Sequence, residues 1–189
     1  DFDLNLLSKI YEPPFEIPVE KSFDKSKKDN YPNKFYILRN LQHSVLALND
    51  ARASVLKKVD KNTVYGIKSR NAEQTFAINA LINSDIPLIT ITGKAGTGKT
   101  LIALAAALHV RKSYRQIYVA RPIIPLSNKD IGYLPGDVES KLAPYMQPLW
   151  DNLKVIQDQF METDKQHQTI SQMVKEQKLV IEPLSYIRG

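Results

Sequence analysis

The 189-residue sequence contains no cysteine, and none of its apolar runs is long enough to cross a membrane. The first absence excludes a disulfide framework and a cysteine-ligated zinc site. The second excludes a transmembrane helix, which needs about 20 consecutive apolar residues. No secretory signal peptide is visible, although a chain that starts at Asp1 without Met leaves room for an upstream segment. We therefore expect a cytoplasmic protein with no membrane partner.

Two kinds of metal site are also missing. The histidines lie far apart in the sequence, without ligand spacing, at His43, His109 and His167. The apolar run 179–181 is followed by Glu182. This arrangement resembles the Walker B strand, whose terminal acid holds Mg²⁺ in ATPases. However, only one acid is present and Pro183 follows it at once, so a plain core strand is the better interpretation.

Charge of one sign is in modest excess. The sequence has 26 Lys and Arg against 20 Asp and Glu, a formal net charge of +6. Such an excess suggests a polyanionic partner such as nucleic acid, but it also occurs in proteins that bind only nucleotides. The charges are dispersed, and the densest cluster is Lys25, Lys27 and Lys28. Charge alone leaves both possibilities open.

One loop carries a strong chemical signal. It fits the phosphate-binding pattern G-x-x-x-x-G-K-S/T at every fixed position, with the sequence Gly93, Lys94, Ala95, Gly96, Thr97, Gly98, Lys99, Thr100. Residues 86–92 are β-branched and apolar, which predicts a buried strand, and residues 101–110 are rich in Ala and Leu, which predicts a buried helix. A glycine turn that binds nothing would not need a strand before it and a helix after it.

The residue types in the loop explain the expected chemistry. Glycines let successive backbone amides converge on phosphate oxygens, and the helix that begins near Gly98 directs its positive end to the same place. Lys99 can reach the β- and γ-phosphates, and the Thr100 hydroxyl can ligate Mg²⁺. We therefore expect residues 93–100 and the adjoining Leu101 to bind a nucleotide, with Lys99 and Thr100 in the catalytic roles.

The chain divides into three parts by composition. Residues 1–33 are rich in proline and polar side chains, which predicts an extended linker or the tail of an upstream domain. Residues 34–65 contain short strand-like segments and predict a small antiparallel β-meander. Residues 66–189 alternate strand and helix patterns, which predicts an α/β core. Its strands at 87–92 and 116–120 are expected to be parallel, in a right-handed βαβ unit.

Two side chains outside the loop are candidates for the same site. Gln74 follows Asn71 at capping-box spacing, so it either caps a helix or reads the edge of an adenine. Arg121 ends the second core strand, at the edge where ligands of such sheets bind, although a solvated arginine is also common there.

The C-terminal part has less specific patterns. Pro144 and Pro148 fall inside a helix-like segment, which predicts two short helices or one kinked helix. Its aromatic face, with Tyr145 and Trp150, is more typical of core or a subunit contact than of a base-stacking surface. Residues 154–178 are polar and predict a solvent-facing insertion, and residues 179–182 predict a third core strand.

Several motifs together resemble the PhoH-like ATPase family. They are the phosphate loop and residues 119–122, 130–136, 141–148 and 181–189. The resemblance covers residues 34–189 and implies a three-layer, RecA-like P-loop NTPase core related to superfamily-one helicases. It also implies ATP and Mg²⁺ as cofactors, RNA as a partner, and a ring-shaped homo-oligomer, possibly a hexamer.

The resemblance changes three interpretations. It favours adenine reading by Gln74, and it makes Arg121 and Arg188 candidates for nucleic-acid contact or nucleotide sensing. It also implies that the Walker B acids follow Gly189, so that the core is incomplete here and Glu182 is not one of them. Many members carry an upstream PIN-type nuclease domain, of which residues 1–20 could be the end, but we assign no nuclease activity to them.

The sequence thus predicts an ATP-hydrolysing protein that acts on RNA, as a helicase or remodelling ATPase. The alternative is a module that binds or assembles in response to ATP without separating strands. A small-molecule kinase is a third possibility.

Overall fold

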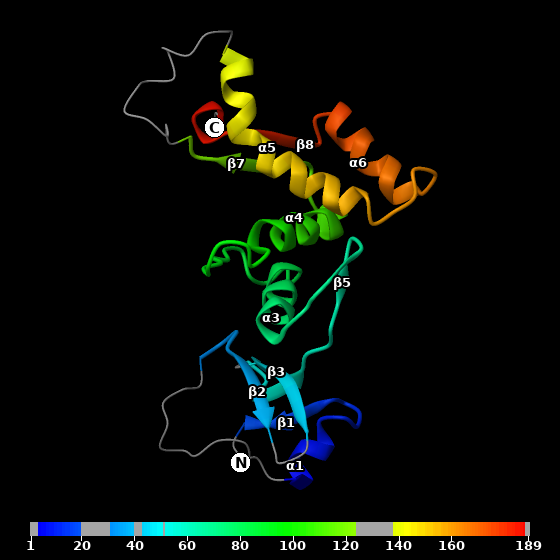
Figure 1. The fold of residues 1–189 in the computed structure, drawn as a ribbon. Helices are drawn as coiled ribbons and strands as arrows, with labels where there is room; N and C mark the ends of the chain where they lie inside the picture. The colour runs from blue at the N-terminus through cyan, green and yellow to red at the C-terminus, as the bar shows by residue number, and fades with distance from the viewer. Residues whose placement is uncertain (1–3, 20–30, 40–42, 51, 124–137, 188–189) are drawn as a thin grey trace. The chain divides into compact units, whose positions relative to one another are not determined.

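The computed structural model describes residues 4–19, 31–39, 43–50, 52–123 and 138–187 (Figure 1). The chain forms two compact units. The first contains residues 1–62 and 68–89, and the second contains residues 63–67 and 90–189. Together they give a mixed α/β protein with antiparallel and parallel sheets.

The first unit is built on a four-stranded antiparallel sheet. Its strand order is β1 (Glu16–Pro18), β4 (Val55–Lys58), β3 (Ser44–Asp50), β2 (Phe35–Arg39). Burial alternates along β3, where Val45 and Ala47 face the core and their neighbours are more exposed. This period of two is the signature of a strand with one covered face. The predicted β-meander is confirmed in β2, β3 and β4.

The N-terminal segment differs from the expected linker. Residues Leu4–Lys9 form helix α1, and β1 pairs with β4 from Glu16↔Lys57 to Pro18↔Val55. Leu7, Ile10 and Ile17 are at most 2% exposed and belong to the core of this unit. Proline was a misleading signal because β1 lies at the edge of the sheet, where a residue without an amide hydrogen is tolerated.

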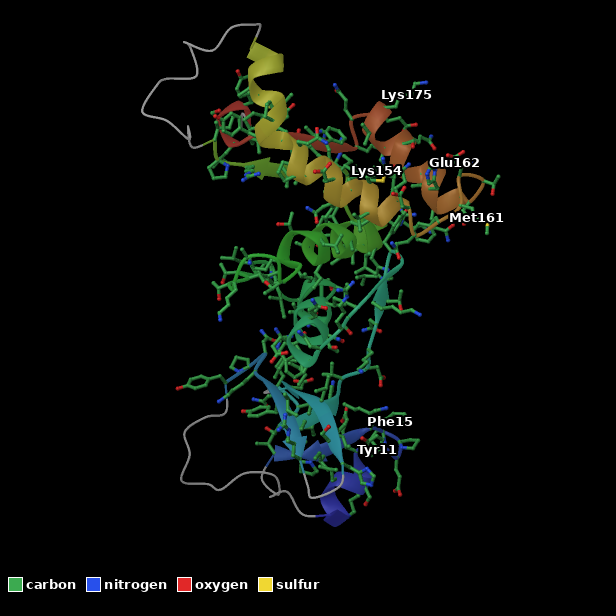
Figure 2. All side chains as sticks on the ribbon, viewed as in Figure 1. Tyr11, Phe15, Lys154, Met161, Glu162 and Lys175 are labelled. Carbon is green, nitrogen blue, oxygen red and sulfur yellow. The ribbon has the colours of Figure 1, made fainter. Side chains whose placement is uncertain are left out.

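Two exposed aromatic rings lie beside this sheet. Figure 2 labels Tyr11 and Phe15 on the loop between α1 and β1, and they are 48% and 45% exposed. The Lys58 ammonium lies 5.4 Å from the centre of the Tyr11 ring and 5.6 Å from that of Phe15. Lys58 also pairs with Asp60 at 3.0 Å. The lysine is therefore held against both rings by cation–π attraction.

Helix α3 (Ala72–Leu81) completes the first unit. Its buried residues are Thr75 and Ile78. The Thr75 hydroxyl donates to the Asn71 carbonyl at 2.9 Å, which satisfies a polar group inside the unit. Phe76 is half-buried and stacks on Phe35, with 4.8 Å between ring centres.

The second unit contains a two-stranded parallel sheet. Strands β7 (Ile117–Arg121) and β8 (Leu179–Pro183) pair from Ile117↔Leu179 to Arg121↔Pro183, and Figure 1 shows them side by side. The chain between them forms α5 (Val138–Gln157) and α6 (Lys165–Lys175), which both pack against β8, while α4 (Lys99–Val110) contacts β7 and α5. The prediction of parallel core strands is confirmed for this pair.

The strand predicted over residues 86–92 is wrong. Those residues have no regular secondary structure, and Leu88 is 81% exposed. A strand requires a hydrogen-bonded neighbour, and within the described part of the chain β7 and β8 pair only with each other. The expected βαβ unit through α4 is therefore replaced by one in which α5 and α6 connect β7 to β8.

The helices after the loop also settle two expectations. Residues 138–157 form one helix that includes Pro144 and Pro148, and Figure 1 shows it changing direction, so the kinked alternative is confirmed. Of the aromatic face expected to be core or a subunit contact, Tyr145 is half-buried and Trp150 is 37% exposed. The buried residues along the helix include Met146, Leu149, Leu153 and Ile156. The predicted solvent-facing segment includes α6, most of whose residues are exposed or half-buried, and its buried residues are Ile170 and Met173, on a helix that contacts β8.

Short elements complete the description. Strands β5 (Thr63–Val64) and β6 (Ile67–Lys68) form a hairpin whose turn residues, Tyr65 and Gly66, have φ of 44° and 82°. A side chain at Gly66 would lie only 2.7 Å from the Cβ of Gln159, so this turn requires glycine. The 3-10 helices are η1 (Arg111–Ser113) and η3 (Leu184–Tyr186).

Candidate functional site

The phosphate loop is an exposed turn that leads directly into α4. Gly96 and Gly98 have φ of 75° and 81°, in the left-handed region that side chains disfavour. A Cβ on Gly96 would meet no atom within 4 Å, so backbone conformation rather than space requires glycine there. Glycine is therefore favoured at these positions because of the left-handed backbone conformation.

Lys99 folds back over this curled backbone. Its ammonium donates to the carbonyl of Gly93 at 2.8 Å and to that of Lys94 at 2.7 Å. The Thr97 hydroxyl donates to the same Lys94 carbonyl at 2.9 Å. None of the ion pairs among the described residues involves Lys99. Only neutral carbonyl and hydroxyl groups hold the charge, which is thus available to an anion.

The N-terminus of α4 offers further donors. Gly98 is the N-cap residue and supplies no side-chain acceptor, and the first bond of the helix runs from the Ile102 amide to the Gly98 carbonyl at 2.9 Å. The amides of the first turn have no partner inside a helix, and they attract anions together with the helix dipole. Thr100 is exposed on this turn, while Ile102 is buried and anchors it.

The residues present fit the phosphates of a nucleotide. Lys99 and the amides of the loop supply positive groups, and the Thr100 hydroxyl is a hard oxygen ligand of the kind Mg²⁺ accepts. Among the described residues, no group of three or more His, Cys, Asp and Glu side chains could hold a metal. A metal bound here would therefore share the Thr100 oxygen with oxygens of the nucleotide.

Gln74 takes part in the cap of α3. Asn71 is the N-cap, and its side-chain oxygen accepts from the Gln74 amide at 2.9 Å. The Gln74 side-chain oxygen in turn accepts from the Arg70 amide at 2.8 Å. The capping interpretation is confirmed. Gln74 belongs to the first unit and the phosphate loop to the second, so adenine reading stays a prediction.

Arg121 is the last residue of β7, as predicted. It is exposed, and its Nη1 donates to the carbonyl of Tyr145 on α5 at 3.1 Å. This single bond attaches the end of β7 to α5 and leaves the other guanidinium hydrogens available. Arg188, the remaining candidate, lies outside the described residues, as do the motif at 130–136 and the lysines at 25–28.

Comparison with known proteins identifies the family. Residues 66–189, about two thirds of the chain, match the model of the PhoH-like protein family. The chain belongs to the PhoH-like family. This is a family of P-loop ATPases, so the match bears out the resemblance drawn from the motifs.

Relatives of this PhoH-like chain are named consistently. It is 41% identical over 167 residues to "Protein PhoH2" of Bacillus subtilis, covering 84% of this chain and 37% of that protein. It is 32% identical over 160 residues to "Protein PhoH2" of Thermobispora bispora, covering 78% and 35%. It is 38% identical over 96 residues to "Protein PhoH" of Escherichia coli, covering 50% and 26%.

The chain spans little more than a third of the length of the PhoH2 proteins it matches, and no solved structure matches it. None of the helices described in the structure has the length and apolar character needed to span a membrane.

Sequence reasoning missed one group of side chains. Arg111, Lys112 and Arg115 follow α4, and α6 and Lys178 complete a hollow with them. Arg111, Lys112 and Arg115 lie within five residues of one another in the sequence, beside Tyr114, and that cluster was the available signal. Only folding brings Lys178 and Glu176 to the same hollow.

Proposed function

We propose that this PhoH-like chain binds ATP with Mg²⁺ at residues 93–100 and that the protein hydrolyses it in order to act on RNA. The observation that carries the proposal is the curled loop at the start of α4. Gly96 and Gly98 have left-handed φ, and neutral carbonyl groups of the loop hold the Lys99 ammonium. A phosphate can replace the carbonyl partners of that ammonium.

Each residue has a distinct expected role. The amides of the loop and of the first turn of α4 would hold the phosphates, and Lys99 would balance charge on the β- and γ-phosphates. Mg²⁺, when bound at Thr100, would neutralise phosphate charge. Leu101 and Ile102 would keep the turn in place through packing. Gln74 would select adenine if the two units bring it to the base.

The RNA part of the proposal has separate support. The net charge is +6, and Arg121 is exposed at the carboxyl end of a parallel strand, the edge at which such sheets bind ligands. We further propose a cytoplasmic homo-oligomer, of ring form as the family resemblance implies. The alternative function is ATP-dependent assembly or binding without strand separation.

The nucleotide site is tested by direct titration of ATP. Lys99→Ala should abolish measurable binding, because no other described cation contacts the loop carbonyls. Lys165→Ala, an exposed lysine on α6, is the matched control and should leave the affinity unchanged. Equal affinity in the Lys99→Ala variant and the unaltered chain would refute the site.

The RNA part is tested by ATP turnover with and without single-stranded RNA, and by unwinding of a short RNA duplex. These are measured on the whole protein. Stimulation and unwinding support the proposal. Oligomerisation on ATP addition without unwinding would favour the alternative, and phosphate transfer to a small metabolite would favour a kinase.

A further inference from the structure

The second unit contains a hollow at the end of α4, away from the phosphate loop. It has a volume of about 320 Å³ and lies between η1, the following turn, the amino end of β7 and one side of α6. Ile117 lines it, whereas Arg121 ends the same strand. The hollow therefore adjoins the amino end of β7, about 13 Å along the strand from Arg121 at its carboxyl end.

The lining of this hollow is strongly basic. Four cations face a single acid, Glu176, and they are Arg111, Lys112, Arg115 and Lys178. The Glu176 carboxylate is already engaged, by the Lys178 ammonium at 2.7 Å and by the Gln172 amide at 2.6 Å. The hydrogen bond from Lys178 lowers the pKa of Glu176. Three positive charges thus remain without a counter-charge in the lining.

Arg111 is held rigidly in this hollow. Its guanidinium lies 5.1 Å from the centre of the Tyr65 ring, and its Nη1 donates to the Leu108 carbonyl at 2.9 Å. Tyr65 is itself fixed, since it is 7% exposed and its hydroxyl donates to the Gln166 carbonyl at 2.9 Å. A cation positioned before binding loses little side-chain entropy when a ligand arrives.

Stabilisation of the helix end explains only part of this arrangement. Cations near the C-terminus of a helix interact favourably with its dipole, but the effect fades beyond the last turn. Arg111, bonded to a carbonyl of α4, fits that role. Lys112 and Arg115 are exposed and, among the described residues, have no hydrogen-bond or ion-pair partner. They lie on either side of Tyr114 in the sequence, and its ring is 60% exposed.

We propose that this hollow binds single-stranded RNA. Arg111, Lys112 and Arg115 contact phosphate groups of the strand, and Tyr114 stacks on one base. Cations combined with an exposed aromatic ring are the chemistry by which single strands are held without base-pair readout. The inference rests on the proposed RNA-directed function and adds a second contact, at the amino end of β7.

The test measures binding of a fluorescent single-stranded RNA oligonucleotide to the chain by anisotropy, over a series of salt concentrations. The variants are Lys112→Glu/Arg115→Glu, Tyr114→Ala and Tyr114→Phe. The control is Lys154→Glu/Lys165→Glu, which changes net charge equally on exposed side chains outside the hollow; Figure 2 labels Lys154. Circular dichroism melting confirms that each variant is folded.

The variants in the hollow should have distinct effects on RNA binding. Loss of two phosphate contacts should lower the slope of log affinity against log salt by about 1.4, since each contact to a single strand contributes about 0.7. Tyr114→Ala should weaken binding by about fivefold or more, and Tyr114→Phe should restore it because the ring is retained. The control should keep most of the slope, and ATP affinity should stay unchanged throughout.

Other outcomes would overturn the inference in identifiable ways. If the unaltered chain binds RNA and the Lys112→Glu/Arg115→Glu variant loses no more affinity than the control, the hollow is not the RNA site. The proposed RNA function would then still stand. No RNA binding by the unaltered chain would count against both, while ATP titration would still report on the phosphate loop. Displacement of the RNA by free AMP or by polyglutamate at the same concentration of charge would assign the hollow to a mononucleotide or an acidic protein.

Discussion

The two units differ in how their sheets are made. The first unit closes four antiparallel strands over a cluster of buried residues. The parallel sheet described in the second unit has two strands, β7 and β8, and this unit carries an exposed phosphate loop and a basic hollow. Both units bury apolar side chains, around the sheet in the first and along α4, α5 and α6 in the second. The second unit in addition leaves its distinctive polar groups accessible, so the proposed binding sites lie in that unit.

The difference follows from sequence separation. Strands β2, β3 and β4 follow one another closely in the sequence, so their contacts close small loops at low entropic cost. Strands β7 and β8 are separated by α5 and α6, and parallel pairing always needs such a crossover. The second unit thus depends more on helix packing to hold its parallel strands together.

The largest expected stability effect comes from core truncation in either unit. Leu56 in β4 and Leu108 in α4 are both fully buried, so Leu56→Ala and Leu108→Ala should each cost about 2–5 kcal/mol of unfolding free energy. Leu56→Ala should leave ATP affinity intact, while Leu108→Ala should weaken it, because α4 carries the phosphate loop. Urea unfolding and ATP titration measure both, and equal affinity losses would contradict the separation of roles.

Nucleotide binding should stabilise one unit selectively. At a ligand concentration 100 times Kd, Mg–ATP should add about 2.7 kcal/mol of stability to the part that binds it. Hydrogen exchange should slow at the amides of α4 and stay unchanged in β3. The Lys99→Ala variant serves as the control and should show no protection. Equal slowing in β3 would show that the units respond as one.

Gln74 distinguishes a cap from an adenine contact. Gln74→Ala removes the bond to the Arg70 amide and should cost about 1 kcal/mol of stability. If Gln74 also reads adenine, the ratio of ATP to GTP affinity should fall. Asn71→Ala removes the other half of the cap and is the matched control, with a similar stability loss and no change in selectivity. An unchanged ratio in Gln74→Ala would leave the residue a cap alone.

The smallest expected effect is electrostatic and is confined to the first unit. The Lys57 ammonium lies 2.8 Å from the Asp50 carboxylate and its hydrogen bond lowers the pKa of Asp50 below the ordinary 3.8. Stability from this pair is therefore present above pH 3.8 and is lost as pH falls through the lowered pKa. Asp50 in turn raises the pKa of Lys57 above 10.5, so the same stability is present below pH 10.5 and is lost as pH rises through the raised pKa.

Lys57→Met tests this pair. The urea midpoint of the unaltered chain should fall more steeply with acid than that of the variant, and the effect should be small because both side chains contact solvent. Parallel pH profiles would show that the pair contributes nothing measurable.

Local patterns in the sequence were enough for some features of both units. The turn at residues 93–100, the start of α4 at Lys99 and the cap of α3 at Asn71 depend on residues close in the chain. Glycine conformation, helix propensity and side-chain capping act over that range. The β-meander was predictable for the same reason.

Features that depend on distant partners were missed. The apolar residues 86–92 have the composition of a strand but no paired neighbour among the described residues. The proline-containing segment at Glu16–Pro18 has the composition of a linker but pairs as an edge strand. Composition reports the preference of a segment, whereas pairing depends on what else the fold places beside it.

The sequence by itself determined that this chain carries the phosphate-loop motif and belongs among PhoH-like proteins, because contiguous residues form each motif. Only the tertiary structure decided that the neighbouring residues Arg111, Lys112 and Arg115 share a hollow with Glu176 and Lys178, which lie far from them in the sequence. Charges far apart in a sequence have no mutual energy until folding brings them within a few ångströms, where Coulomb attraction and hydrogen bonding become strong.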